Sequence, residues 1–218
     1  MNRSHKFHLI IITSLLLMAC ALFASPGTPT GNSANDTTEI PPTFLPSTVT
    51  SLEQPTRTGP EFENLLVDVP PDFKIDYQAE QNNMVINEMV PQNESVNDWT
   101  TLVTVQIFLG LVNTTPEQYQ ETLTQSWFDA CANSESYPVA NGAENGYNFV
   151  LWQLYCPLNP ATQKVEYAYL KAIQGNDSFY LVQVAFRYEP SSDDITRWMN
   201  YLKGVIVCDS RIPERICP

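Results

Sequence analysis

Residues Lys164–Pro190, KVEYAYLKAIQGNDSFYLVQVAFRYEP, decide the fold of this chain. Both halves are rich in β-branched and aromatic residues, and Gly175-Asn176-Asp177 between them tolerate the positive φ that a tight turn needs. In the second half, alternate residues share one face: Tyr180, Val182, Val184, Phe186 and Tyr188. The opposite face carries Leu181, Gln183, Ala185 and Arg187. This period of two is typical of a half-covered antiparallel strand, so we predict a central β-hairpin onto which two helices pack.

Further strands are predicted on the N-terminal side of this hairpin. Asn82 and Asn83 favour a tight turn between two of them, and two more hairpin signals lie at Asn141-Gly142 and Asn145-Gly146. The predicted strands are Leu65–Val69, Phe73–Gln81, Met84–Val90, Trp99–Leu109, Tyr137–Ala140 and Asn148–Cys156.

Two amphipathic helices complete the pattern. Thr115-Pro116-Glu117-Gln118 has the composition of a capping box, and Ser191 to Asp194 has the same S-x-x-D form. The first helix directs one stripe towards the core: Tyr119, Leu123, Trp127, Ala130 and Cys131. The second has the stripe Ile195, Trp198, Met199 and Leu202, ends at Gly204 and leads into an extended Val205–Cys208. Hairpin-connected strands with two helices predict a single α+β domain with an antiparallel sheet.

The N-terminus has the features of an export signal over residues 1–19. Arg3 and Lys6 precede an apolar run of ten residues, Leu9–Met18, which is too short to span a bilayer as a stable helix. Leu17-Met18-Ala19-Cys20 resembles the lipobox of bacterial lipoproteins, in which the cysteine is lipidated, and Ala21 resembles the sorting pattern for the outer membrane. We therefore expect lipidation at Cys20 and a location facing the periplasm. The alternative is ordinary cleavage near Ala21 and secretion without lipid.

Residues 20–62 are rich in Pro, Thr, Ser, Gly and Asn and contain almost no spaced apolar residues. Such a segment cannot bury enough surface to offset its ordering entropy, so we predict a disordered tether. Residues 63–218 then form the globular domain.

The charge balance excludes one class of partner. Removing Arg3 and Lys6 from the 11 basic residues leaves 9 against 24 acidic residues, a net charge of −15. Nucleic acid and anionic lipid need a concentrated basic surface, so neither is expected to bind the domain. The acidic surface favours solubility. The alternative is that it recruits cations or a basic protein partner.

Four cysteines remain after Cys20, and an even number in an exported chain favours disulfides. Three pairings are open. We favour Cys208–Cys217, which closes a short loop, and Cys131–Cys156, which joins a helix end to a strand end. No C-x-x-C spacing supports a metal site, and no cofactor motif is present.

The sequence also argues against most catalytic arrangements. Its two histidines, His5 and His8, lie in the export signal, so the exported domain has no imidazole base and no Ser-His or Cys-His pair. A pair of carboxylates, as in sugar hydrolysis, remains possible among Glu88, Glu144, Glu166 and Asp177. Asp193-Asp194 is interpreted first as a charge pair at a helix start.

The element order resembles the PsbP-like fold family between about residues 65 and 207. The resemblance rests on Val69-Pro70-Pro71-Asp72-Phe73 before a hairpin, the Thr115-Pro116-Glu117 helix, the meander and the closing helix. It implies a non-enzymatic accessory protein that binds a larger assembly. The chain is also similar to exported bacterial proteins that share Asn97-Asp98-Trp99, Asn145-Gly146-Tyr147 and Cys208-Asp209, a similarity that implies no particular activity.

Three functions follow from these observations. The first is a non-enzymatic envelope lipoprotein whose disulfide-stapled domain binds a protein through exposed aromatic residues and its acidic surface. The second is a secreted effector with the same domain and no lipid. The third is a glycan hydrolase of the cell wall that uses two carboxylates.

Overall fold

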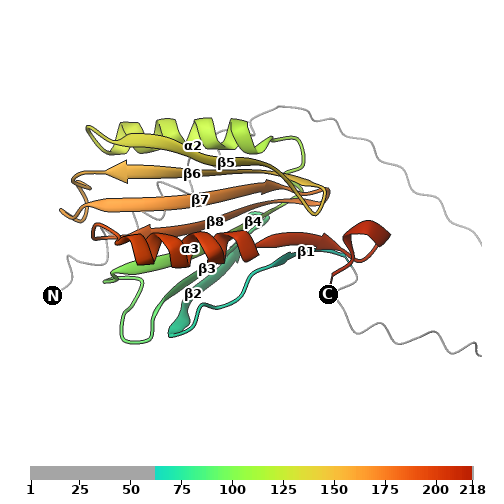
Figure 1. Cartoon of the computed structure of the whole chain (residues 1–218), viewed down its shortest axis with the longest axis horizontal. Coiled ribbons are helices and arrows are strands. Elements are labelled where there is room, and N and C mark those ends of the chain that lie inside the picture. Colours follow the sequence, from blue (N-terminus) through green and yellow to red (C-terminus); the bar gives the residue numbers. More distant parts are fainter. Residues whose placement is uncertain (1–61, 218) are drawn as a thin grey trace, which may run out of the picture. The chain divides into compact units, whose positions relative to one another are not determined.

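Seven antiparallel strands form the main sheet of the computed structural model, which describes residues 62–217 (Figure 1). Their spatial order is β2-β3-β4-β8-β7-β6-β5, so β2 and β5 are the edges. The strands are β2 (Phe73–Gln81), β3 (Met84–Pro91), β4 (Thr101–Leu109), β5 (Glu135–Glu144), β6 (Tyr147–Cys156), β7 (Glu166–Gln174) and β8 (Ser178–Phe186). Two helices, α2 (Pro116–Ala130) and α3 (Ser192–Gly204), pack on the sheet. The predicted α+β class is confirmed.

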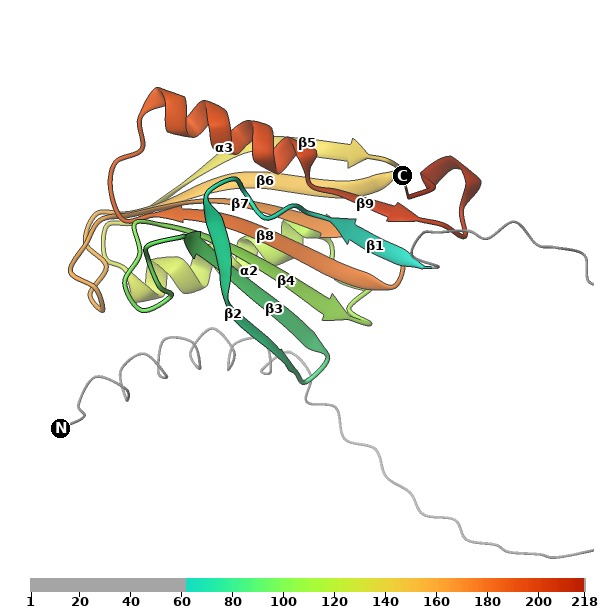
Figure 2. The same cartoon turned by 90° about the horizontal axis from the view of Figure 1, so that it is seen from below.

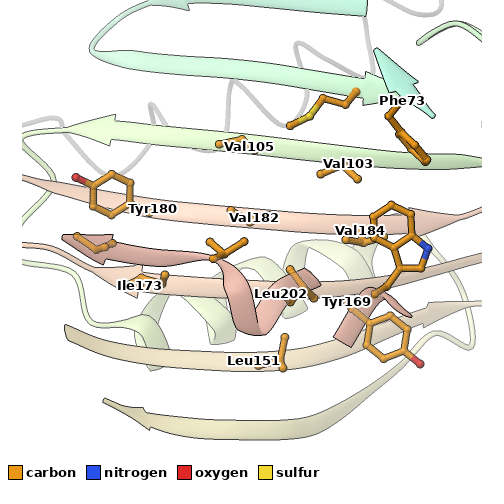
Figure 3. Close-up of a cluster of buried hydrophobic side chains, with 14 of the residues drawn as sticks. Phe73, Val103, Val105, Leu151, Tyr169, Ile173, Tyr180, Val182, Val184 and Leu202 are labelled. Atoms are coloured by element: carbon orange, nitrogen blue, oxygen red, sulfur yellow. The ribbon is translucent and has the colours of Figure 1, made fainter. Parts of the chain in front are cut away.

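Helix α3 covers one face of the sheet. Ser191 accepts the backbone N–H of Asp194, whose carboxylate accepts from the backbone N–H of Ser191, so the predicted capping box is confirmed. Trp198 packs edge-on against Phe73, with 5.3 Å between ring centroids, and Leu202 is fully buried. Figure 3 shows Leu202 among side chains from β4, β6, β7 and β8. This face holds the main hydrophobic core.

Helix α2 packs on the opposite face, mainly against β6 and β7 (Figure 2). Thr115 and Gln118 form the predicted capping box. The ring of Tyr119 lies 4.8 Å from that of Phe179, and Trp127 donates its indole N–H to a β6 carbonyl. Ala130, however, is exposed, because the helix ends there and Cys131 leaves it in an extended conformation. The prediction of a core contact for Ala130 is therefore wrong.

The central hairpin is confirmed as β7 and β8, but two details of the prediction are wrong. Strand β8 is covered on both faces, because it lies between α3 and the α2 layer, and only Gln183 along its length is not fully buried. The turn also needs no positive φ at residues 175–177. Gly175 is instead required for space, since a Cβ there would collide with the carboxylate of Glu63.

The other turns follow the predicted chemistry more closely. Asn82 and Asn83 both have positive φ, at 53° and 59°, in the β2–β3 turn. Asn145 and Gly146, at 49° and 75°, form the β5–β6 turn. Asn141-Gly142 forms no turn, because β5 continues through it to Glu144. Four strands, β5 to β8, therefore form one meander.

A second, two-stranded sheet pairs the N-terminal and C-terminal strands of the domain. In it β1 (Glu63–Leu66) runs antiparallel to β9 (Ile206–Asp209), with Glu63 opposite Asp209. The β1 strand lies earlier than the predicted Leu65–Val69, and its pairing with β9 is a long-range contact that local patterns do not reveal. Beyond β9, a short 3₁₀ helix, η1 (Pro213–Arg215), precedes Cys217.

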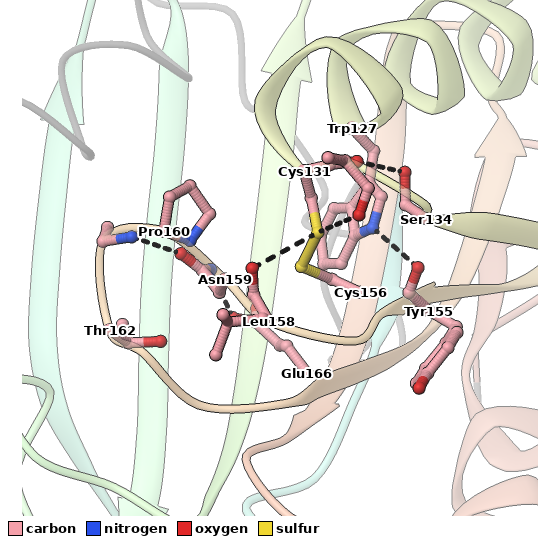
Figure 4. The surroundings of a disulfide bond; sticks show 12 residues. Trp127, Cys131, Ser134, Tyr155, Cys156, Leu158, Asn159, Pro160, Thr162 and Glu166 are labelled. Atoms are coloured by element: carbon pink, nitrogen blue, oxygen red, sulfur yellow. Dashed lines mark hydrogen bonds between the residues drawn. A yellow bond between two sulfur atoms is a disulfide. The ribbon is translucent and has the colours of Figure 1, made fainter.

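Two disulfides join the cysteines in the pairing that the sequence favours. Cys131 at the end of α2 is bonded to Cys156 at the end of β6 (Figure 4). Cys208 of β9 is bonded to Cys217. The first bridge fixes α2 to the sheet. The second closes the C-terminal loop over η1.

Candidate functional site

A group of tyrosines occupies the α3 face of the sheet at one end of β5, β6 and β7. Two cross-strand rows carry them. The first row is Glu135, Tyr155, Tyr167 and Phe186, and the second is Tyr137, Gln153, Tyr169 and Val184. Because residues opposite one another in a ladder point to the same face, these side chains adjoin. We call Tyr137, Gln153, Tyr155 and Tyr167 the tyrosine patch.

The tyrosine patch is accessible to solvent. Tyr137 on the edge strand is 46% exposed, and Gln153, Tyr155 and Tyr167 are half-buried. Tyr169, one strand further in, is buried against Phe186 and belongs to the core. In Figure 1, α3 runs over β8, whereas β5 and β6 carry no helix on that side. The patch is thus the border where the covered core meets an open aromatic surface.

Two of the tyrosines form a rigid pair. The rings of Tyr155 and Tyr167 lie 4.8 Å apart at an interplanar angle of 39°. Partial burial raises the pKa of Tyr167, with smaller contributions from the Glu189 carboxylate and the Tyr155 hydroxyl. The Tyr167 hydroxyl is therefore neutral at pH 7 and able to donate a hydrogen bond. Tyrosines fixed on strands lose little conformational entropy on contact, which is why they dominate many interfaces.

Carboxylates flank the tyrosine patch on both sides. Glu135 is the ladder partner of Tyr155 on the outer strand, and Glu189 follows β8 close enough to influence Tyr167. Both glutamates are exposed. The two rows contain no Lys or Arg. The surroundings of the patch are therefore acidic.

The opposite end of the sheet is held by an internal polar network. Glu63 accepts the backbone N–H groups of Asn176, Asp177 and Ser178 at 2.5–3.2 Å. It also accepts the hydroxyl of Tyr180 at 2.9 Å. Every contact here is made within the domain. The network fixes β1 against the β7–β8 turn.

Arg211 extends this network into the C-terminal loop. It pairs with Asp209 at 2.7 Å and with Asp177 at 2.6 Å. Hydrogen bonds from Arg211 lower the pKa of Asp209, whose side chain is almost fully buried. The disulfide loop is thereby attached to the β7–β8 turn.

A shallow hollow of about 290 Å³ lies beside this network. Gln174, Asn176 and Arg215 contribute to its lining. Arg215 stacks on Tyr147 at 4.5 Å, and a Cβ at Gly146 would collide with its guanidinium group. Arg215 thus attaches the C-terminal loop to the β5–β6 turn, and we assign it a structural role.

Buried Lys171 stabilises the end of α3. It is 1% exposed and donates hydrogen bonds to the carbonyls of Leu202 and Val205 at 3.0 and 2.8 Å, and it is paired with Glu144. Burial lowers the pKa of Lys171, while Glu144 opposes this shift. The lysine satisfies carbonyls at the C-terminus of a helix, where a cation is favourable.

The four candidate acids of the sequence are not brought together as a catalytic pair. Glu144 pairs with Lys171, and Asp177 pairs with Arg211. Glu166, at the other end of β7, accepts from Asn159, and burial raises its pKa. Glu88 lies on β3, and burial raises its pKa too. Asp194 serves as a helix cap, as expected, and Ser191 lowers its pKa.

Other sequence predictions concern lipid, metal and membrane. Cys20, the predicted lipidation site, lies outside the described residues. Within residues 62–217, no cluster of three potential metal ligands occurs. Over the same range, no helix has the length and apolar character needed to span a membrane.

Sequence reasoning missed the residues of the tyrosine patch. Tyr155 and Tyr167 belong to predicted strands, but they come from two strands that are adjacent only in the folded sheet. The available signal was the tyrosine at alternate positions, Tyr167 and Tyr169, in β7. The alternation predicts a shared face, but it does not say that α3 stops short of one of the two residues.

Comparisons with known proteins found similarity to solved structures only, at low sequence identity and low TM-score. No protein-family model matches the chain, and no curated protein is significantly similar in sequence. Among solved structures, a cyanobacterial PsbP from Synechocystis is 10% identical, with 72% of this chain and 98% of that chain covered, at a TM-score of 0.39.

Two further structures show the same general similarity. The Ran-binding protein Mog1p of Saccharomyces cerevisiae is 10% identical, covering 63% of this chain and 78% of that chain, with a TM-score of 0.39. LpqN of Mycobacterium tuberculosis, involved in cell envelope biogenesis, is 7% identical, with 70% of this chain and 87% of that chain covered, at a TM-score of 0.35. At these identities and TM-scores we base no functional argument on them.

Proposed function

We propose that this chain is a non-enzymatic, exported envelope lipoprotein whose domain binds a protein partner through the tyrosine patch. The observation that carries the proposal is the open aromatic surface of Tyr137, Tyr155 and Tyr167 on a rigid sheet. Uncovered aromatic groups on rigid elements are typical of binding surfaces. The four candidate acids do not support a hydrolase, because each has a structural partner or lies apart from the others.

The disulfides support an exported protein. All four cysteines of residues 62–217 are paired in disulfides, and Cys208 and Cys217 are only nine positions apart in sequence. Disulfides persist in oxidising compartments and are rare in the cytosol. The proposal therefore includes export through residues 1–19, lipid attachment at Cys20, and a location facing the periplasm. Release without lipid is the alternative.

The position of the patch suits a domain attached by its N-terminus. Glu63, where the domain begins, contacts the β7–β8 turn, whereas Tyr167 lies at the start of β7. The nine residues of β7 separate the two ends by about 25 Å, at ~3.3 Å per residue. A tether at residue 63 leaves the tyrosine patch at the far end, accessible to a partner.

Photocrosslinking in intact cells tests the binding function. A photoreactive amino acid replaces Gln153 in the patch or, as a matched control, Glu121 on the exposed side of α2. We expect a discrete crosslinked protein from position 153 and none from position 121. Equal crosslinking from both positions, or none from 153, would contradict the proposed binding surface.

Mass spectrometry of the mature N-terminus tests the lipid. The expected result is a diacylated or triacylated peptide beginning at Cys20, which is lost in Cys20→Ser. An unmodified peptide that begins after Ala21 would exclude the lipoprotein and leave the secreted alternative.

A further inference from the structure

We propose that the tyrosine patch recognises a basic, extended segment of its partner, with Arg or Lys side chains stacked on Tyr137, Tyr155 and Tyr167. This inference rests on the function proposed above and adds the chemistry of the partner. It follows from the unoccupied aromatic faces, the charges around them and the spacing of the strands.

The aromatic faces of the patch carry no cation from the chain itself. The domain uses cation–π contacts elsewhere, with Arg187 at 3.8 Å from the Trp99 ring centre and Arg215 at 4.5 Å from that of Tyr147. None of the cation–π pairs among the described residues involves a patch tyrosine. Exposed tyrosine faces attract ammonium and guanidinium groups. The patch therefore offers an external cation the exposed ring of Tyr137 and the half-buried rings of the Tyr155–Tyr167 pair.

The flanking carboxylates favour the same ligand. Neither Glu135 nor Glu189 forms a salt bridge within residues 62–217, whereas Asp177, Asp209 and Glu144 are all paired. An incoming cation would meet a carboxylate on each side of the tyrosines. Residues 63–218 carry 8 basic and 20 acidic residues, and their net charge of −12 also steers basic partners towards the domain and repels acidic ones.

The spacing of the strands favours an extended segment. Tyr137 on β5 and Tyr167 on β7 are two strand spacings apart across the sheet and two residues apart along it, about 12 Å in all. In a segment with the extended polyproline II conformation, residues i and i+3 lie on the same side, about 9 Å apart at ~3.1 Å per residue. A segment that crosses the strands can thus place one basic side chain near Tyr137 and the next near Tyr167.

Peptide binding to the full chain, purified from the envelope in detergent, tests this chemistry. The probe is a fluorescent 12-residue peptide with Arg at every third position among Gly and Ser, and the matched control has Gln in place of Arg. By fluorescence anisotropy we expect at least about tenfold tighter binding of the Arg peptide, which weakens as salt rises. Equal binding of the two peptides would overturn the inference.

Two kinds of variant, with matched net charge, distinguish recognition by the tyrosine patch from general electrostatic attraction to the domain. Tyr137→Ser/Tyr167→Leu leaves the net charge unchanged and should weaken Arg-peptide binding about fivefold or more. Glu135→Gln/Glu189→Gln should weaken it more than Glu80→Gln/Glu121→Gln, which removes the same charge from exposed sites elsewhere. If the tyrosine variant binds like the wild type, or if both charge variants lose equally, the peptide is held by general attraction and the inference is wrong.

The experiments distinguish failure of the proposed binding function from failure of the basic-segment inference. A crosslinked partner at position 153 without Arg-peptide binding would overturn the basic-segment inference and leave the proposed function standing. No crosslink and no peptide binding would overturn both. Unchanged thermal unfolding midpoints of the variants would show that a loss of binding does not come from misfolding.

Discussion

The hydroxyl of Tyr180 donates to Glu63 across 117 positions of sequence, at 2.9 Å. The same carboxylate accepts three successive backbone N–H groups of the β7–β8 turn. One buried side chain of the first strand thus satisfies the turn of the central hairpin. The first prediction concerns this contact.

Gly175→Ala should destabilise the domain through Glu63. Gly175 has no positive φ, so the cost comes from the collision of the new Cβ with the Glu63 carboxylate and the Ser178 carbonyl, about 1–3 kcal/mol. Urea unfolding of Gly175→Ala, Glu63→Ala and the double variant measures it. Because the double variant keeps only the contact of the new Cβ with the Ser178 carbonyl, its loss should be smaller than the sum of the single losses. Additive losses would contradict this account.

Removing the Cys131–Cys156 bridge should cost more than removing Cys208–Cys217. The sequence separations are 25 and 9 residues, so the chain-entropy term differs by about 1 kcal/mol. Urea unfolding of the two double-alanine variants measures the difference. A larger loss at Cys208–Cys217 would show that fixing the C-terminal loop matters more than chain entropy.

Lys171→Met should lower the free energy of unfolding by about 2–4 kcal/mol, because two buried carbonyls and Glu144 lose their donor. Lys203→Met, an exposed lysine in the last turn of the same helix, is the control and should change stability by less than about 0.5 kcal/mol. Equal effects would mean that the buried lysine contributes little to capping α3. Chemical denaturation at pH 7 gives both values.

The Asp209–Arg211 contact predicts a pH dependence. Arg211 lowers the pKa of Asp209 below its ordinary 3.8, so the ionised carboxylate stabilises the fold. This stabilisation is complete above pH 3.8 and is lost as pH falls through the lowered pKa. Asp209→Asn should therefore be less stable than wild type at pH 6, and the gap should narrow towards about pH 2.5. A gap that is constant with pH, measured by urea unfolding, would contradict the assignment.

Local sequence patterns predicted most elements because their signals are local. The capping boxes at Thr115 and Ser191, and the turns at Asn82-Asn83 and Asn145-Gly146, depend on neighbours within four residues. The disulfide pairing was also favoured, because Cys208–Cys217 closes a short loop and Cys131–Cys156 joins a helix end to a strand end. The export signal, the lipid at Cys20 and the tether stay predictions, since they lie outside the described residues.

Long-range contacts explain what the sequence did not predict. The prediction that β8 is covered on one face only was wrong, because the alternation of residues in one strand does not show how many layers pack on the sheet. The turn at Gly175 was misinterpreted because a Cβ there is excluded largely by Glu63, more than a hundred residues away, together with the Ser178 carbonyl. The tyrosine patch was missed for the same reason, since the fold buries Tyr169 against Phe186 and leaves Tyr155 and Tyr167 accessible.

The pairing of β1 with β9 has a mechanical consequence. The hydrogen bonds of an antiparallel ladder lie across the strands, and β1 runs roughly along the main sheet in Figure 1. Tension between residue 63 and a partner held at the tyrosine patch would therefore act along β1. Such a force stretches all the bonds of the short ladder together in shear, rather than peeling them one at a time. A domain pulled in this direction should unfold at a higher force than one pulled apart between Glu63 and Asp209.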